Sequence, residues 1–143
     1  MTRVSRTMAA TVLLASAFVT GYAVGQPPKI QMKTLLQTER AWDGQPYRAY
    51  PGGQPQVSLL EITIPAKTTM EWHRHPMPNV AYVMSGEIQV ETKDGKTAHF
   101  RPGQTISETV ATTHRGVTGD RAVTLLVFYA GATGLPLSQL EAK

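Results

Sequence analysis

The chain has 143 residues, of which 41% are hydrophobic and 17% are charged, with a formal net charge of +4 and no cysteine. This length fits one domain, and the composition excludes a disordered chain, a collagen-like repeat and a disulfide scaffold. Two of the fourteen basic residues, Arg3 and Arg6, lie in a segment that we expect to be removed, which leaves a net charge of +2. Because this excess is small and scattered along the chain, it does not favour nucleic acid as a partner.

The N-terminal segment has the layout of a secretory signal peptide. The two arginines precede an apolar stretch over residues 8–19, and small residues follow up to Gly25. We predict that residues 1–25 are a signal peptide and that the mature chain, 26–143, is secreted or periplasmic without a membrane attachment. The alternative is an uncleaved anchor, but the apolar stretch is shorter than the roughly 20 residues that a span needs. Lipid attachment is excluded because there is no cysteine.

Short apolar or alternating runs recur through the mature chain, and each is bounded by Gly, Pro, Asn or Asp. They cover residues 33–38, 57–64, 69–75, 80–85, 87–92, 97–100, 104–108, 113–117 and 122–129. Such spacing is typical of an all-β domain whose strands bury one face. Asp94 and Gly95 stand between two of these runs and predict a hairpin turn. Only residues 138–143 have the pattern of a short terminal helix, so we predict a single all-β barrel or sandwich.

Two histidines are separated by a single residue within the run 69–75. Alternation along a strand would place His73 and His75 on one face, together with Glu71. Imidazoles paired in this way are good ligands for Zn, Fe, Mn, Ni or Cu if a further ligand converges from another strand, and His114 is the candidate. On the pair alone, the alternative is that the histidines fill a polar patch without a metal.

Two stretches around these histidines resemble the two motifs of the cupin superfamily. The first covers residues 65–86 and reads PAKTTMEWHRHPMPNVAYVMSG, with Gly86 at the position of its closing glycine. The second covers residues 103–118 and reads GQTISETVATTHRGVT, with His114 at the position of its single histidine. The resemblance extends over residues 65–118 and weakens outside them.

This resemblance implies that residues 26–143 form one cupin-like double-stranded β-helix, or jelly-roll barrel. It also implies that His73, His75 and His114 bind a divalent transition metal, with Fe(II) favoured and Zn, Mn, Ni or Cu as alternatives. Asn79 stands where the first motif of the family carries a Glu or Gln ligand. Since an amide oxygen is a weaker, neutral ligand, we expect three imidazoles plus water, with Asn79 as a loose fourth ligand or a hydrogen-bond donor to a bound oxygen species.

Two further departures from the family pattern concern turns rather than ligands. Lys67 occupies the position of the glycine that usually precedes the histidine pair. Residues 109–111 replace the Pro-x-Gly element that usually precedes the last histidine. We expect both changes to be tolerated.

Other titratable residues have two readings each. Glu71 is the candidate general base or orienter of an imidazole, and the alternative is a solvated acid at the mouth of the barrel. Glu108 either acts near His114, whose strand parity it shares, or forms an ion pair with a basic residue such as Arg115. His99 is predicted to lie on the surface, with a ligand role as the alternative, because its neighbour in the strand is an apolar residue that we expect to face inward.

The leading functional hypothesis is an exported, non-haem metal-dependent dioxygenase that acts on a small organic substrate. Three neutral ligands leave a metal its full positive charge, which favours chelation of an anionic substrate. The alternative is a non-catalytic barrel that binds a metal or a small molecule, as a receptor or accessory protein, and a third possibility is an empty barrel.

Three large apolar residues near the histidine pair, Met70, Trp72 and Met77, either line a ligand pocket or pack in the core. We expect a homodimer, since similar barrels commonly pair through their sheets.

Overall fold

Nine strands and no helix make up the part of the chain that this computed structural model describes, residues 29–141. The strands are β1 (Pro55–Ile64), β2 (His73–Arg74), β3 (Asn79–Ser85), β4 (Ile88–Thr92), β5 (Thr97–Phe100), β6 (Thr105–Ser107), β7 (His114–Thr118), β8 (Val123–Ala132) and β9 (Gln139–Leu140). The predicted signal peptide lies outside the described residues. Within residues 29–141, no helix is long and apolar enough to cross a membrane.

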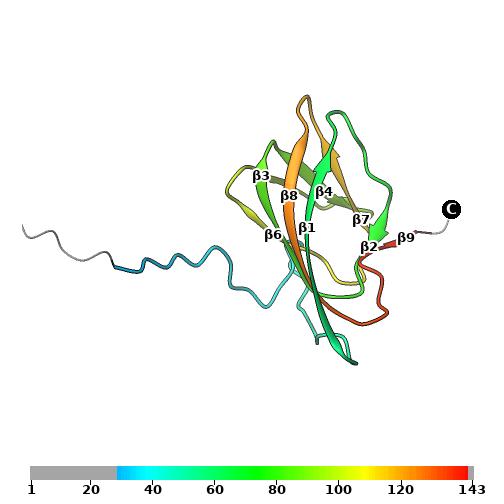
Figure 1. Cartoon of the computed structure of the whole chain (residues 1–143). Helices are drawn as coiled ribbons and strands as arrows, with labels where there is room; N and C mark the ends of the chain where they lie inside the picture. The colour runs from blue at the N-terminus through cyan, green and yellow to red at the C-terminus, as the bar shows by residue number, and fades with distance from the viewer. Residues whose placement is uncertain (1–28, 142–143) are drawn as a thin grey trace, which may run out of the picture. The chain divides into compact units, whose positions relative to one another are not determined.

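The strands form two antiparallel sheets (Figure 1). One sheet has the order β1-β8-β3-β6, and the other has the order β5-β4-β7-β2-β9. Apart from the hairpin β4-β5, neighbours in these sheets are not consecutive in sequence: β1 pairs with β8 over its whole length, from Pro55 opposite Ala132 to Ile64 opposite Val123. This arrangement confirms the predicted all-β jelly-roll barrel.

The core lies between the two sheets and is built from alternate residues of their strands. β8 shows the pattern most clearly, because Val123, Leu125, Val127 and Tyr129 are buried while Phe128 is exposed. The other buried members of the core cluster are Ile64, Met77, Ala81, Val83, Ile88, Val90 and Ile106. The period of two that predicted the strands therefore also separates the core face from the outer face.

Eight of the nine predicted runs contain a strand at or near the expected place, and the Asp94–Gly95 turn joins β4 to β5. In contrast, residues 33–38 form no strand. The predicted terminal helix is wrong as well: the described part of that segment contains β9, which pairs with β2 at Leu140 opposite His73. A six-residue segment is too short to form a stable helix without packing. The edge of β2, in contrast, has backbone N–H and C=O groups with which this segment can pair as a strand.

The positions of the two missing motif glycines still adopt a glycine-like backbone. Lys67 has a φ of 54° and Ala111 a φ of 62°, both in the left-handed region that L side chains rarely adopt. The amide of Ala111 donates to the carbonyl of His75 at 2.9 Å. The left-handed turn is therefore retained at both positions, and at Ala111 it ties the loop before β7 to the histidine pair.

Candidate metal centre

The three histidines come from two neighbouring strands of the five-stranded sheet. His73 on β2 is the direct cross-strand partner of His114 on β7. His75 lies just beyond β2 and is joined to Val110 by an isolated bridge. Between the two histidines of the pair, Arg74 points outward and donates to Gln139 of β9 at 3.1 Å. Strand alternation thus turns both imidazoles inward, as the sequence predicts.

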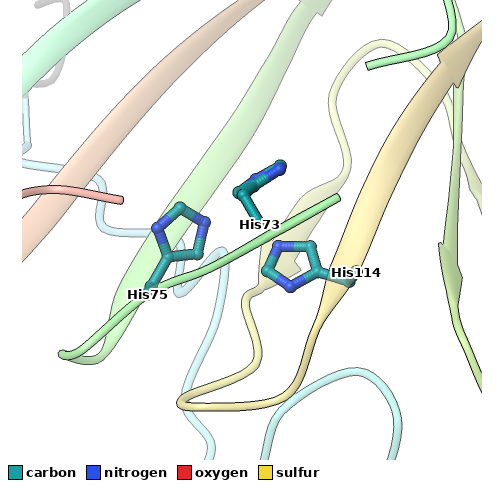
Figure 2. Close-up of side chains that lie close together, drawn as sticks. All are labelled: His73, His75 and His114. Carbon is teal, nitrogen blue, oxygen red and sulfur yellow. The ribbon is translucent and has the colours of Figure 1, made fainter. Parts of the chain in front are cut away.

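The three imidazoles face one another at the inner surface of this sheet (Figure 2). The ring centroid of His73 is 5.1 Å from that of His75 and 4.6 Å from that of His114, and the remaining pair is 5.1 Å apart. One ligand nitrogen from each residue can be chosen so that all three lie within 4.8 Å of one another. This spacing allows the three histidines to bind one metal ion.

Backbone carbonyls fix the orientation of all three rings. His73 Nδ1 donates to the carbonyl of Glu71 at 2.9 Å, and His75 Nδ1 donates to that of Leu137 at 2.7 Å. His114 Nδ1 lies 2.9 Å from the carbonyl of Thr112. Because a carbonyl only accepts, each Nδ1 carries the proton, and in the neutral ring the lone pair is then on Nε2. This is the arrangement by which metal-ligating histidines are usually held.

A carboxylate lies beside the imidazoles. Glu108 follows β6, is buried, and places Oε2 at 3.3 Å from Nε2 of His114. Neither of these two atoms has a hydrogen-bond partner among the described residues, and the same holds for Oδ1 of the buried Asn79. Three buried polar atoms without a hydrogen-bond partner therefore belong to residues that line one cavity, where a cation could satisfy them.

Burial and the carboxylate control the charge of the histidines. Burial lowers the pKa of His73 and of His75, which keeps both neutral and able to bind a metal near pH 7. For His114, burial also acts to lower the pKa, but the adjacent Glu108 carboxylate outweighs it and raises the pKa. For Glu108, burial opposes ionisation, yet the neighbouring histidines, His114 foremost, lower its pKa. The site therefore holds one ionised carboxylate beside three imidazoles.

The histidines line a cavity of about 60 Å³. Its polar lining is completed by Asn79, Glu108 and Tyr129, and the remaining lining is aliphatic apart from Met70 and Gly116. Burial, followed by the charge of Glu108, raises the pKa of Tyr129 to about 12, so that its hydroxyl remains protonated. The cavity has room for an ion with a few waters or a ligand of a few heavy atoms, and Tyr129 offers it a hydrogen-bond donor.

Size alone would not identify this site. Two larger hollows of about 520 and 590 Å³ on the described surface contain none of the three histidines. The first is lined in part by His99, which is exposed, in agreement with the prediction that it is a surface residue. Ligand chemistry therefore locates the candidate centre in the smallest of these cavities.

The structure separates the alternatives for the two acidic residues. Glu71 is exposed and precedes the first residue of β2, so strand alternation does not extend to it; only its carbonyl acts at the site, by holding His73. The prediction that its side chain faces inward with the histidines is therefore wrong. Arg115 forms its ion pair with Glu91 on the adjacent strand, which leaves Glu108 free to face His114.

The three large apolar residues near the histidine pair lie in different surroundings. Met77 is fully buried in the core, and Met70 packs against the core while also lining the cavity. Trp72 lies outside the cavity lining, with the guanidinium of Arg115 at 4.2 Å from its ring centroid. Pocket lining therefore holds for Met70 alone, and Trp72 is covered by a cation on the outer surface of the sheet.

Two tyrosines at the site were missed by sequence reasoning. Tyr129 was detectable, because alternation along residues 122–129 places it on the inner face with Val127. Tyr47 belongs to a loop, and its hydroxyl donates to the backbone carbonyl of Glu108 at 2.8 Å. This contact joins residues 61 positions apart, so no local sequence pattern predicts it.

The fold and the site together define a class of protein: a small jelly-roll barrel whose inner face carries three histidines that could hold one metal ion. The family model of the cupin domain matches residues 60–129. The chain belongs to the cupin superfamily.

Solved structures with the same fold are distant in sequence. The DMSP lyase DddQ from Ruegeria pomeroyi DSS-3 is 19% identical with a TM-score of 0.54, over 70% of this chain and 49% of its own. The polyketide cyclase RemF from Streptomyces resistomycificus is 22% identical with a TM-score of 0.53, over 64% of each chain. Oxalate decarboxylase from Lactobacillus farciminis is 18% identical with a TM-score of 0.50, over 59% of this chain and 26% of its own.

This chain thus spans about half the length of the DMSP lyase that it matches. No curated protein matches it significantly. At these identities, the likeness to solved structures establishes the fold and not the reaction.

Proposed function

We propose that this protein is an exported, mononuclear metal-dependent enzyme that acts on a small organic anion, with dioxygenase chemistry as the reaction class. The convergence of His73, His75 and His114 carries the proposal, because three oriented imidazoles can hold one ion. The small cavity limits the substrate to a few heavy atoms at the metal. Export rests on the basic and apolar pattern of residues 1–25.

The residues of the cavity have separate tasks in this proposal. The three imidazoles would hold the ion, and Fe(II), when bound, would supply the one-electron chemistry that dioxygen activation needs. The hydroxyl of Tyr129 donates a hydrogen bond to an anionic substrate and keeps its proton, given its pKa of about 12. The aliphatic part of the lining lowers the local dielectric constant, and this strengthens each electrostatic contact within the cavity.

Metal content and oxygen uptake test this proposal on mature protein purified without a histidine tag. We expect close to one equivalent of metal by mass spectrometry, and oxygen consumption by the Fe(II)-loaded protein with one class among small diketones, thiols and phenolics. The small volume of the cavity also favours the second candidate, a non-catalytic metal-binding barrel. Full metal occupancy without oxygen uptake on any of these substrates would support that candidate and reject the dioxygenase.

We also propose a homodimer formed through the outer face of the four-stranded sheet. Leu59 on β1 lies opposite Phe128 on β8, and both are exposed, at 64% and 42%. Val57, on the same face of β1, is 69% exposed. Adjacent exposed apolar side chains on a sheet with β1 at its edge are suited to a self-complementary interface.

Sedimentation at tens of micromolar tests the dimer, and we expect the mass of two chains. Leu59→Glu should give a monomer, because it would bring like charges together across a two-fold interface. A wild-type protein that sediments only as a monomer would contradict the dimer without affecting the metal proposal.

A further inference from the structure

The acidic residue of the cavity lies directly across from the position where the family motif has its carboxylate. β3 and β6 are antiparallel, with Val80 opposite Ser107 and Ala81 opposite Ile106. The next pair in this register is Asn79 and Glu108, and the amide of Glu108 donates to the carbonyl of Asn79 at 3.0 Å. Directly opposed residues of an antiparallel pair have their Cβ atoms about 5 Å apart, so the two side chains enter the same volume.

Both side chains point into the cavity, and neither is satisfied there. Asn79 is 2% exposed and Glu108 is 9% exposed, and both line the cavity with the three histidines. The amide nitrogen of Asn79 has its carbonyl partner, Met77, at 3.4 Å, whereas Oδ1 has no hydrogen-bond partner within the described chain. Oε2 of the buried Glu108 likewise has no hydrogen-bond partner within the described chain, and a buried carboxylate oxygen left in this state is costly unless a cation lies against it.

The position of the carboxylate relative to His114 fits shared coordination of one ion. Nε2 of His114 and Oε2 of Glu108 are 3.3 Å apart and make no hydrogen bond with each other. Nδ1 of His114 is taken up by the carbonyl of Thr112, so Nε2 is the ring nitrogen that faces this oxygen and is placed to bind an ion. A separation of 3.3 Å is that of two neighbouring ligands, each about 2.1 Å from one ion, at an angle of roughly 100°.

We infer that Glu108 is the fourth protein ligand of the metal, so that the carboxylate absent from position 79 is supplied by the opposed residue on the neighbouring strand. The centre is then three imidazoles and one carboxylate, with a net charge one unit lower than the three imidazoles alone would give. This inference rests on the metal binding in the proposed function. It assigns the anionic ligand to a residue of the second motif, between its leading Gly103 and His114, in place of the ligand position of the first motif.

Metal affinity and the absorption spectrum of bound Co(II) test this assignment, because both report on ligands without requiring a substrate. Glu108→Gln keeps the shape of the side chain and removes its charge, and we expect Co(II) and Zn(II) affinity to fall by at least 10- to 100-fold, with a changed Co(II) spectrum. The matched control is Glu87→Gln, at an exposed residue paired with Arg101, which should change neither. Circular dichroism of the metal-free variants checks that each is folded.

A carboxylate exchange across the strand pair makes the test specific. The double variant Asn79→Glu, Glu108→Gln should recover affinity to within several-fold of the wild type, since it returns the charge to the same volume from the opposite strand. A Glu108→Gln protein with wild-type affinity and an unchanged Co(II) spectrum would overturn the assignment, and so would a folded double variant with no recovery. A wild-type protein that binds no metal would instead overturn the proposed function itself.

Discussion

His114→Ala is expected to lose tight metal binding, with an affinity loss greater than the roughly 10- to 100-fold that follows removal of an outer partner of a metal ligand. The variant removes an imidazole that is 2% exposed and leaves Glu108 without its nearest neighbour. Bound metal stabilises the native state by about 4 kcal/mol at a thousand times its Kd, and this stabilisation should also disappear. Titration calorimetry and thermal unfolding with and without Zn(II) measure the two effects.

The fourth histidine provides the matched control for this experiment. His99 is exposed on β5 and lies outside the cavity, so His99→Ala should retain one equivalent of metal and its thermal stabilisation. If His114→Ala keeps the metal, or if His99→Ala loses it, the assignment of the centre to His73, His75 and His114 is wrong. Unfolding of the metal-free proteins separates the loss of a ligand from a loss of fold.

Gly86→Ala is expected to destabilise the protein by at least about 3 kcal/mol, a large part of the 5–15 kcal/mol by which a typical domain is stable. Gly86 lies in the turn between β3 and β4 with a φ of 73°, where an L side chain is already strained. A Cβ atom there would lie 2.2 Å from the carbonyl oxygen of Ala122 and 2.9 Å from Cα of Val123. Because these are backbone atoms, the strand β8 would have to move. Chemical denaturation measures the loss.

Gly95→Ala separates the effect of crowding from the effect of backbone conformation. Gly95 has a φ of 88°, similar to that of Gly86, but a Cβ there would meet nothing within 4 Å. We therefore expect only the left-handed strain, about 1 kcal/mol. Equal losses for the two variants would show that crowding against Ala122 contributes nothing, which would contradict the structural account of the closing glycine.

The strands were predictable because their evidence is local. Alternation of apolar residues in 57–64, 80–85 and 122–129 repeats the period of a half-buried strand, and the structure places β1, β3 and β8 there. The Asp94–Gly95 pair encodes its turn through two adjacent residues. The same local rule failed where an element depends on a distant partner, since β9 exists because β2 is available to it.

The candidate metal centre was predictable in part for the same reason. His73 and His75 share a face through alternation alone, and the cupin-like spacing pointed to His114. Strand alternation gave the wrong side for Glu71, because β2 begins only at His73. Glu108 was left between two readings, since only the pairing of Arg115 with Glu91 frees it to face the cavity.

Sequence patterns over a few residues thus specified the all-β class, most of the strands, the hairpin turn and the three-histidine set. Long-range pairing specified the rest: the register that sets Glu108 opposite Asn79, the segment that brings the carbonyl of Leu137 to His75, and the loop that brings Tyr47 to Glu108. The physical reason is that alternation and turn chemistry act between neighbours in the chain. Hydrogen bonds across 61 or 62 residues arise only when the two sheets have closed around the core.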